Sequence, residues 1–315
     1  MIGALALLDA LPVWLLLMIA LISSLTVPLS TSGLRSMYPL IVPRHLWERA
    51  NAVDSNGYAV ASVIGPAGAG LLVGFLGGPV AILATASLFG AAAVVMIGVR
   101  DPDQNTSGTG SLLADAWDGL RYVFRNATLR GLAYSISIAN LGFGVVYIAL
   151  PVLILQRFHR GPQTVGLMWA VLGLFGIIAV TLSGRIRSRG IERQMLGYPQ
   201  FLTATALVLL AFAPSLPVVV LALALIGLSV GPVDIALFTL RQRRTNPAWM
   251  GRAFAVSMAL NFTGLPIGAA LGGPLVSGSL TAAILLAAAL TAVAGFIPLL
   301  AIPAGGDYEE PLPAG

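Results

Sequence analysis

Nine long apolar stretches occupy most of this 315-residue chain and limit what it can fold into. Each is about 18 to 25 residues long, the length that an α-helix needs to cross roughly 30 Å of hydrocarbon. The stretches comprise residues 11–32, 56–77, 79–99, 132–155, 164–183, 195–213, 216–239, 253–276 and 280–302. With 57% hydrophobic and 9% charged residues, the composition excludes a water-soluble globular fold. The sequence therefore predicts an all-α polytopic membrane protein.

Arginine supplies all 17 basic side chains, and these are distributed unevenly between the predicted loops. When the stretches alternate in direction, only Arg157 and Arg160 fall on one face, and the other arginines fall on the opposite face. Basic residues in short loops favour the cytoplasmic side of a membrane. We therefore expect the arginine-rich face and the C-terminal tail in the cytoplasm.

Side chains that carry catalysis or bind metals are scarce and scattered. The chain contains no cysteine, and its two histidines, His45 and His159, lie far apart in predicted loops. No cluster of acids, bases or nucleophiles suggests an active site, and no basic run is interleaved with aromatic residues as in nucleic-acid-binding proteins. The sequence predicts no enzyme activity, cofactor, metal site or nucleic-acid partner, and a lipid bilayer as surroundings.

One connection differs from the short loops elsewhere. Residues 100–130 begin with the polar stretch DPDQNTSGTGS, which is typical of a flexible linker. In the following residues, apolar side chains recur at helical spacing, which predicts an amphipathic helix along the inner membrane surface or under the bundle. We therefore divide the chain into an incomplete N-terminal half at residues 1–99, the linker, a C-terminal half at 131–303 and a tail at 304–315.

A repeat relates the two halves. Arg49 and Arg252 each stand at the predicted cytoplasmic entry to a glycine-rich apolar stretch. Gly65 follows Arg49 by sixteen residues, and Gly268 follows Arg252 by the same number. The spacing indicates two parallel halves, of which the first lacks its beginning.

Parallel six-helix repeats joined by a long cytoplasmic linker are typical of one transporter architecture. In PLIVPRHLWERANAVDSNGYAVASVIGPAGAGLL, residues 39–72, and in the stretch LLADAWDGLRYVFRNATLRGL, the chain resembles the major facilitator superfamily. The likeness is to the branch of bacterial exporters that includes the enterobactin exporter. It implies a two-half helix bundle with nine of twelve transmembrane helices present, lacking the first three.

The resemblance also implies a function and a location. It implies a secondary active transporter of the bacterial plasma membrane that moves a small organic compound outward, by alternating access and in exchange for protons. Two alternatives stay open at this point: a truncated or degenerate membrane protein without transport activity, and a proton-coupled importer.

A group of small residues resembles the antiporter motif that the family carries on its fifth helix. The group consists of Ala61, Gly65, Pro66, Ala69 and Gly70, with alanine at two positions where glycine is usual. Small residues at four-residue spacing let helices approach closely, and proline kinks a helix. Close packing alone is the alternative interpretation.

Residues 184–190 occupy the position of the family's basic loop between its eighth and ninth helices. We expect Arg187 or Arg189 to pair with Glu48 or Asp54 and so to latch the two halves together. The symmetric latch would join Arg252 to a loop that precedes Met1. The alternative is that these arginines only set the topology.

Asp234 is the only acidic residue well inside a predicted span. An intramembrane carboxylate is costly unless it faces protein or water, so Asp234 is a candidate site residue. It could carry the coupling proton, contact the substrate, or form a structural contact with Arg241, seven residues later on the same helical face.

The resemblance implies that the family's fourth, seventh and tenth helices line a substrate cavity. On the fourth helix a polar strip contains Ser23, Thr26 and Ser30. On the seventh helix a similar strip contains Ser137, Asn140 and Tyr147. Together they predict a weakly polar pocket for an amphipathic or apolar organic molecule, although hydroxyl and amide groups in membrane helices also commonly bond to backbone.

Overall fold

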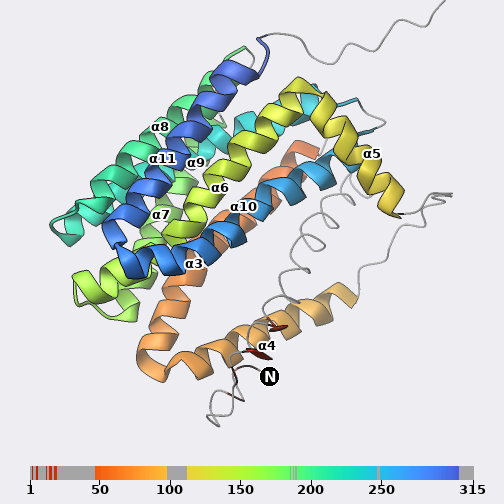
Figure 1. Ribbon diagram of the computed structural model, residues 1–315. Coiled ribbons are helices and arrows are strands. Elements are labelled where there is room, and N and C mark those ends of the chain that lie inside the picture. The colour runs from red at the N-terminus through yellow and green to blue at the C-terminus, as the bar shows by residue number, and fades with distance from the viewer. Residues whose placement is uncertain are drawn as a thin grey trace, which may run out of the picture. The chain divides into compact units, whose positions relative to one another are not determined.

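The computed structural model describes residues 47–97, 112–184, 186, 188, 190–246 and 249–304, together with seven single positions before residue 20. These residues form helices and turns and contain no strand (Figure 1). Within the described ranges, seven helices are long and apolar enough to cross a membrane, by length and composition. The prediction of an all-α, multi-pass fold is therefore confirmed.

Contacts divide the chain into two compact units. One unit comprises Met1–Thr109 and Gly161–Leu167, and the other comprises Gly110–Arg160 and Met168–Gly315. The first unit contains α3 (Trp47–Leu76) and α4 (Gly78–Ile97), which pack against each other. Gly77 separates them with φ of 83°, a left-handed conformation that glycine adopts without the steric cost of a side chain.

The second unit contains the other helices of the described chain. They are α5 (Leu112–Arg125), α6 (Ala127–Val152), the π-helix η2 (Leu153–Arg157), most of α7 (Pro162–Ser183), α8 (Glu192–Ala211), α9 (Leu216–Arg243), α10 (Met250–Gly278) and α11 (Leu280–Ala301). In this unit α6 packs against α10 and α11, and α8 packs against α9 and α11.

The seven crossing helices match the last seven predicted apolar stretches in order. The second predicted stretch, residues 56–77, lies in α3 except for its last residue, and the apolar segment Ile64–Leu76 of this helix is shorter than a full crossing. The first, residues 11–32, lies outside the continuously described residues. Hydropathy located the helices well because the length of an apolar run is what membrane thickness selects.

Small residues let the helices of the second unit approach closely. A Cβ atom on Gly264 or Gly268 of α10 would collide with the α6 backbone at Ser137 or Leu141. Gly144 of α6 faces α10 in the same way. Because lipid supplies no hydrophobic drive for helix association, such close contacts hold membrane helices together by van der Waals packing.

Helix α5 lies within the segment where the linker's amphipathic helix is predicted, and it packs on α10. Gly119 of α5 lies against Arg252 and Val256 of α10, and Val123 is fully buried. After α5 ends, the Asn126 side chain caps α6. Its Oδ1 accepts hydrogen bonds from the backbone amides of Thr128 and Leu129, at 3.0 and 3.1 Å. The chain therefore turns from α5 directly into a membrane-crossing helix.

Candidate functional site

The residues of the polar strip predicted on α6 have two different environments in the structure. Ser137 Oγ donates a hydrogen bond to the Leu260 carbonyl at 2.9 Å, and Asn140 Nδ2 donates to the Asn261 carbonyl at 2.7 Å. Both acceptors belong to α10. These two side chains therefore fasten α6 to α10 at the contact where the glycines bring the helices together.

Tyr147, the third residue of the strip, lies in an aromatic cluster instead. Its side chain is 46% exposed, and its ring stacks on Trp169 of α7 with centroids 4.7 Å apart and planes at 24°. The Phe143 ring meets Tyr147 edge-on at 5.4 Å and Trp169 at 6.1 Å. The three rings form an uncharged, partly open surface within the second unit.

This aromatic cluster has a definite binding chemistry. Aromatic rings stack on other flat rings, and their faces attract cations through the ring quadrupole. The Tyr147 hydroxyl adds one polar group to an otherwise apolar surface. Sequence reasoning missed Phe143, although its spacing of four from Tyr147 places both on one helical face. No local signal in the sequence places the Trp169 ring, on another helix, beside Tyr147.

Arg241 is the most deeply buried charged residue in the described chain, with 0% exposure. The predicted span stops at residue 239, whereas α9 continues to Arg243, so Arg241 lies on the same helix as Asp234. Its Nη1 donates to Met258 Sδ at 3.0 Å. Its Nη2 donates to Asn261 Oδ1 at 2.9 Å, with the amide orientation set by its hydrogen bonds.

Aromatic rings complete the surroundings of Arg241. The guanidinium carbon lies 5.1 Å from the centroid of Phe254 and 5.9 Å from that of Phe238, within the range of cation–π attraction. A buried charge is costly unless hydrogen bonds and other favourable contacts replace the lost water. The neutral groups around Arg241 supply such contacts and join α9 to α10 by side chains.

Asp234 lies on α9, two turns before Arg241, and is half-buried. The structure therefore places this carboxylate neither in bulk water nor in the deepest core. Its three proposed roles stay predictions.

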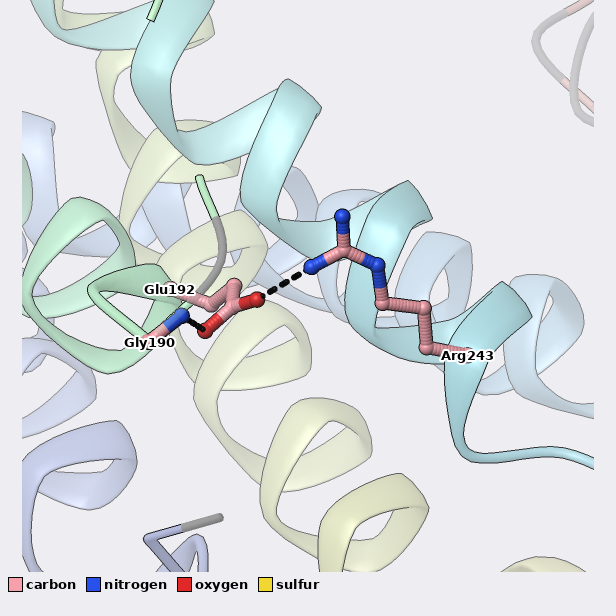
Figure 2. A network of polar contacts seen from close by, with 3 residues as sticks. All are labelled: Gly190, Glu192 and Arg243. Atoms are coloured by element: carbon pink, nitrogen blue, oxygen red, sulfur yellow. Dashed lines mark hydrogen bonds and ion pairs between the residues drawn. The ribbon is translucent and has the colours of Figure 1, made fainter. Parts of the chain in front are cut away.

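An ion pair joins the start of α8 to the end of α9. Figure 2 shows the Glu192 carboxylate between the Gly190 backbone and the Arg243 guanidinium. Glu192 Oε2 accepts from Gly190 N at 2.8 Å, and Oε1 pairs with Arg243 Nη1 at 2.7 Å. Gly190 has φ of 91°, a conformation that favours glycine. Glu192 thus ties the backbone at Gly190 to Arg243, 51 residues away at the end of α9, and sequence reasoning missed this pair.

The antiporter-like motif lies on α3 in the first unit. Ala61, Gly65 and Ala69 are exposed, and a Cβ on Gly65 would meet nothing within 4 Å. A Cβ on Gly70, in contrast, would lie 3.0 Å from the Cα of Gly166 in the same unit. A Cβ on Gly166 would also lie 2.5 Å from the Pro66 carbonyl oxygen, so Pro66 and Gly70 both make a close backbone approach to Gly166.

Several predicted site residues lie outside the described part of the chain. They are Ser23, Thr26, Ser30, Arg187 and Arg189, together with the side chains of Glu48 and Asp54 on α3. Arg252 is exposed and lies 5.7 Å from the ring centroid of Trp249, which stacks on Tyr122. Within the described ranges, no group of three or more histidine, aspartate or glutamate side chains could hold a metal ion.

Comparison with known proteins extends this account beyond the site. Residues 1–264 match a sequence profile described as Major Facilitator Superfamily. An uncharacterized MFS-type transporter, y4rN, from Sinorhizobium fredii is 37% identical over 287 residues, which cover 90% of this chain and 71% of that protein.

Two proteins named as efflux pumps are also similar. The multidrug efflux pump Tap of Mycobacterium tuberculosis is 28% identical over 312 residues, covering 94% of this chain and 72% of the pump. The multidrug efflux pump Tap of Mycolicibacterium fortuitum is 26% identical over 309 residues, covering 93% and 74%.

Proposed function

Because this chain belongs to the major facilitator superfamily, a family of membrane transporters and not of enzymes, we propose that it exports a small organic compound in exchange for protons. Alternating access between two halves would carry the compound across a bacterial plasma membrane. Relatives named as multidrug efflux pumps support the outward direction. Membership of the enterobactin-exporter branch, the absence of the first three helices and the cytoplasmic C-terminus stay predictions.

The aromatic cluster carries the proposal on substrate class. The substrate would stack on the open face of Tyr147, supported from below by Trp169 and Phe143. No charged side chain belongs to the cluster, so the surface suits a flat, amphipathic organic molecule better than a small inorganic ion. Ser137 and Asn140 would not contact the substrate. Their hydrogen bonds to α10 hold α6, and with it the aromatic cluster, in place.

Asp234 is the proposed proton carrier. A carboxylate in a membrane-crossing helix is a functional candidate by default, and its half-buried position on α9 allows it to exchange a proton during the transport cycle. Asp118, exposed on α5 outside the crossing helices, offers a matched control because the same substitution removes the same charge.

Inside-out membrane vesicles that carry the protein in their membrane test both transport and its coupling to protons. Under an imposed gradient with an acidic interior, we expect ethidium, a planar aromatic cation, to accumulate, and a protonophore to release it. Asp234→Asn should abolish this accumulation, whereas Asp118→Asn should preserve it.

The other outcomes separate the rival functions. Absence of ethidium accumulation in vesicles of either orientation would favour a membrane protein without transport activity. Accumulation in right-side-out vesicles alone would favour an importer. Full gradient-dependent uptake by the Asp234→Asn variant would remove the proton role from this carboxylate.

The interdomain latch is a separate proposal. Pairing of Arg187 or Arg189 with Glu48 or Asp54 would stabilise the conformation in which the charges meet. It would thereby raise the population of that conformation relative to the other one. The chain contains no native cysteine, so cysteines at positions 54 and 189 give a clean cross-linking assay. We expect cross-linking in one conformational state only, and no cross-link in any state would rule out the latch.

A further inference from the structure

Helix α5 has two apolar faces, and one of them is covered by protein. On that face a Cβ atom at Gly119 would lie 3.0 Å from Val256 Cγ2 of α10, and Val123 is 0% exposed. The Tyr122 ring stacks on Trp249 with centroids 5.0 Å apart. This face accounts for the attachment of α5 to the second unit.

The other apolar face is open. Trp117, Leu120, Arg121 and Phe124 line a groove of about 430 Å³, and their spacing places them in one stripe along the helix. Trp117 is 66% exposed. The Phe124 ring packs at a tilt against Tyr134 of α6, with centroids 5.9 Å apart, so one lining residue of the groove contacts the membrane-crossing helix. An exposed apolar stripe of this kind marks a surface for a partner or a membrane.

Charge along α5 changes sign near its middle. Asp118 stands three residues before Arg121, within one helical turn of it, and Arg125 lies in the last turn. Arg130, whose Nη1 donates to the Phe124 carbonyl at 3.0 Å, adds a third cation in the first turns of α6. The basic end of the groove therefore adjoins the membrane-crossing helix α6.

Position limits what can occupy this groove. Helix α6 begins at Ala127, two residues after α5 ends, and the ribbon bends sharply there (Figure 1). The bend places α5 where a crossing helix leaves the hydrocarbon. Tryptophan and arginine at such a boundary prefer the headgroup layer, and arginine there attracts anionic lipid. Free phosphate would find few polar groups, because three of the four lining residues are apolar.

We propose that this groove binds one anionic phospholipid, with an acyl chain along Trp117, Leu120 and Phe124 and the phosphate on Arg121. The site rests on the fold of the second unit and does not depend on the proposed transport activity. A lipid held there would fix α5 at the membrane surface and so hold the beginning of α6.

Brominated lipids, which quench nearby tryptophan fluorescence, provide the test. The protein is placed in nanodiscs of phosphatidylcholine with a minor fraction of phosphatidylglycerol, and the brominated chains are carried by one lipid or the other. The Trp117 signal is the difference between the native protein and Trp117→Phe. Arg121→Gln probes the site, and Arg160→Gln, which removes the same charge from an exposed loop position, is the control.

We expect brominated phosphatidylglycerol to quench Trp117 more strongly than its share of the bilayer predicts. Arg121→Gln should lower that enrichment about fivefold, which corresponds to the roughly 1 kcal/mol that one arginine gains near an anionic surface. Arg160→Gln should leave it unchanged. Quenching in proportion to bulk composition, equal loss in both arginine variants, or protection of Trp117 from both lipids would each overturn the proposal.

Discussion

Two parts of the strip along α6 carry polar or aromatic side chains, and they serve different purposes. In the first part, Ser137 and Asn140 donate to backbone carbonyls of α10 across a glycine-lined contact. In the second part, further along α6, Phe143 and Tyr147 form an open surface with Trp169 of α7. The polar groups are thus used in fastening helices, and the aromatic groups are left available to a substrate.

The difference teaches how to interpret a polar strip in a membrane helix. A hydroxyl or amide near hydrocarbon gains most by finding a backbone acceptor, and a glycine contact brings such acceptors within reach. A stacked pair of rings already has its apolar partners and still presents a face outward. We call the α6–α10 contact the closed face and the cluster of Phe143, Tyr147 and Trp169 the open face.

The largest expected effect is at the closed face. Gly268→Leu places a side chain against the Leu141 backbone, so it should destabilise the protein by about 3 kcal/mol, the upper end of the usual cost of overpacking. Gly273→Leu on the same helix is the matched control, because a Cβ there meets nothing within 4 Å. Thermal unfolding followed by size-exclusion chromatography measures both, and equal midpoints would show that the helices do not meet as described.

A smaller effect is expected where side chains join α9 to the closed face. Arg241→Ala removes a fully buried side chain and leaves the Asn261 amide without its donor, so we expect a loss of about 2 kcal/mol. Glu192→Gln, which weakens an ion pair whose arginine is 33% exposed, should cost only about 0.5 kcal/mol. The same unfolding assay ranks the two, and the reverse order would contradict the burial of Arg241.

How much of this could be predicted from the sequence differs between the faces. Helix positions followed from apolar length, and α5 followed from the spacing of its apolar residues. The spacing of Ser137 and Asn140 revealed a strip, but spacing cannot show that the carbonyls of Leu260 and Asn261 occupy it.

The open face and the burial of Arg241 could not be predicted from the sequence for a related reason. Tyr147 and Trp169 lie on different helices, and only helix packing brings their rings to 4.7 Å. Hydropathy gives no sign that an arginine just beyond a predicted span is fully buried. The aromatic, thioether and amide groups that make burial of Arg241 tolerable come from α9 and from α10, beyond the loop that follows it.

Equilibrium binding of ethidium to the purified protein in nanodiscs tests the contrast between the two faces most directly. We expect Tyr147→Ala to weaken binding about fivefold or more, since the open face loses its exposed ring, worth about 1 kcal/mol in stacking and cation–π attraction. Asn140→Ala should change the dissociation constant less than about twofold, although it loosens the closed face. If Asn140→Ala weakens binding and Tyr147→Ala does not, the substrate meets the polar strip and the assignment of the two faces is wrong.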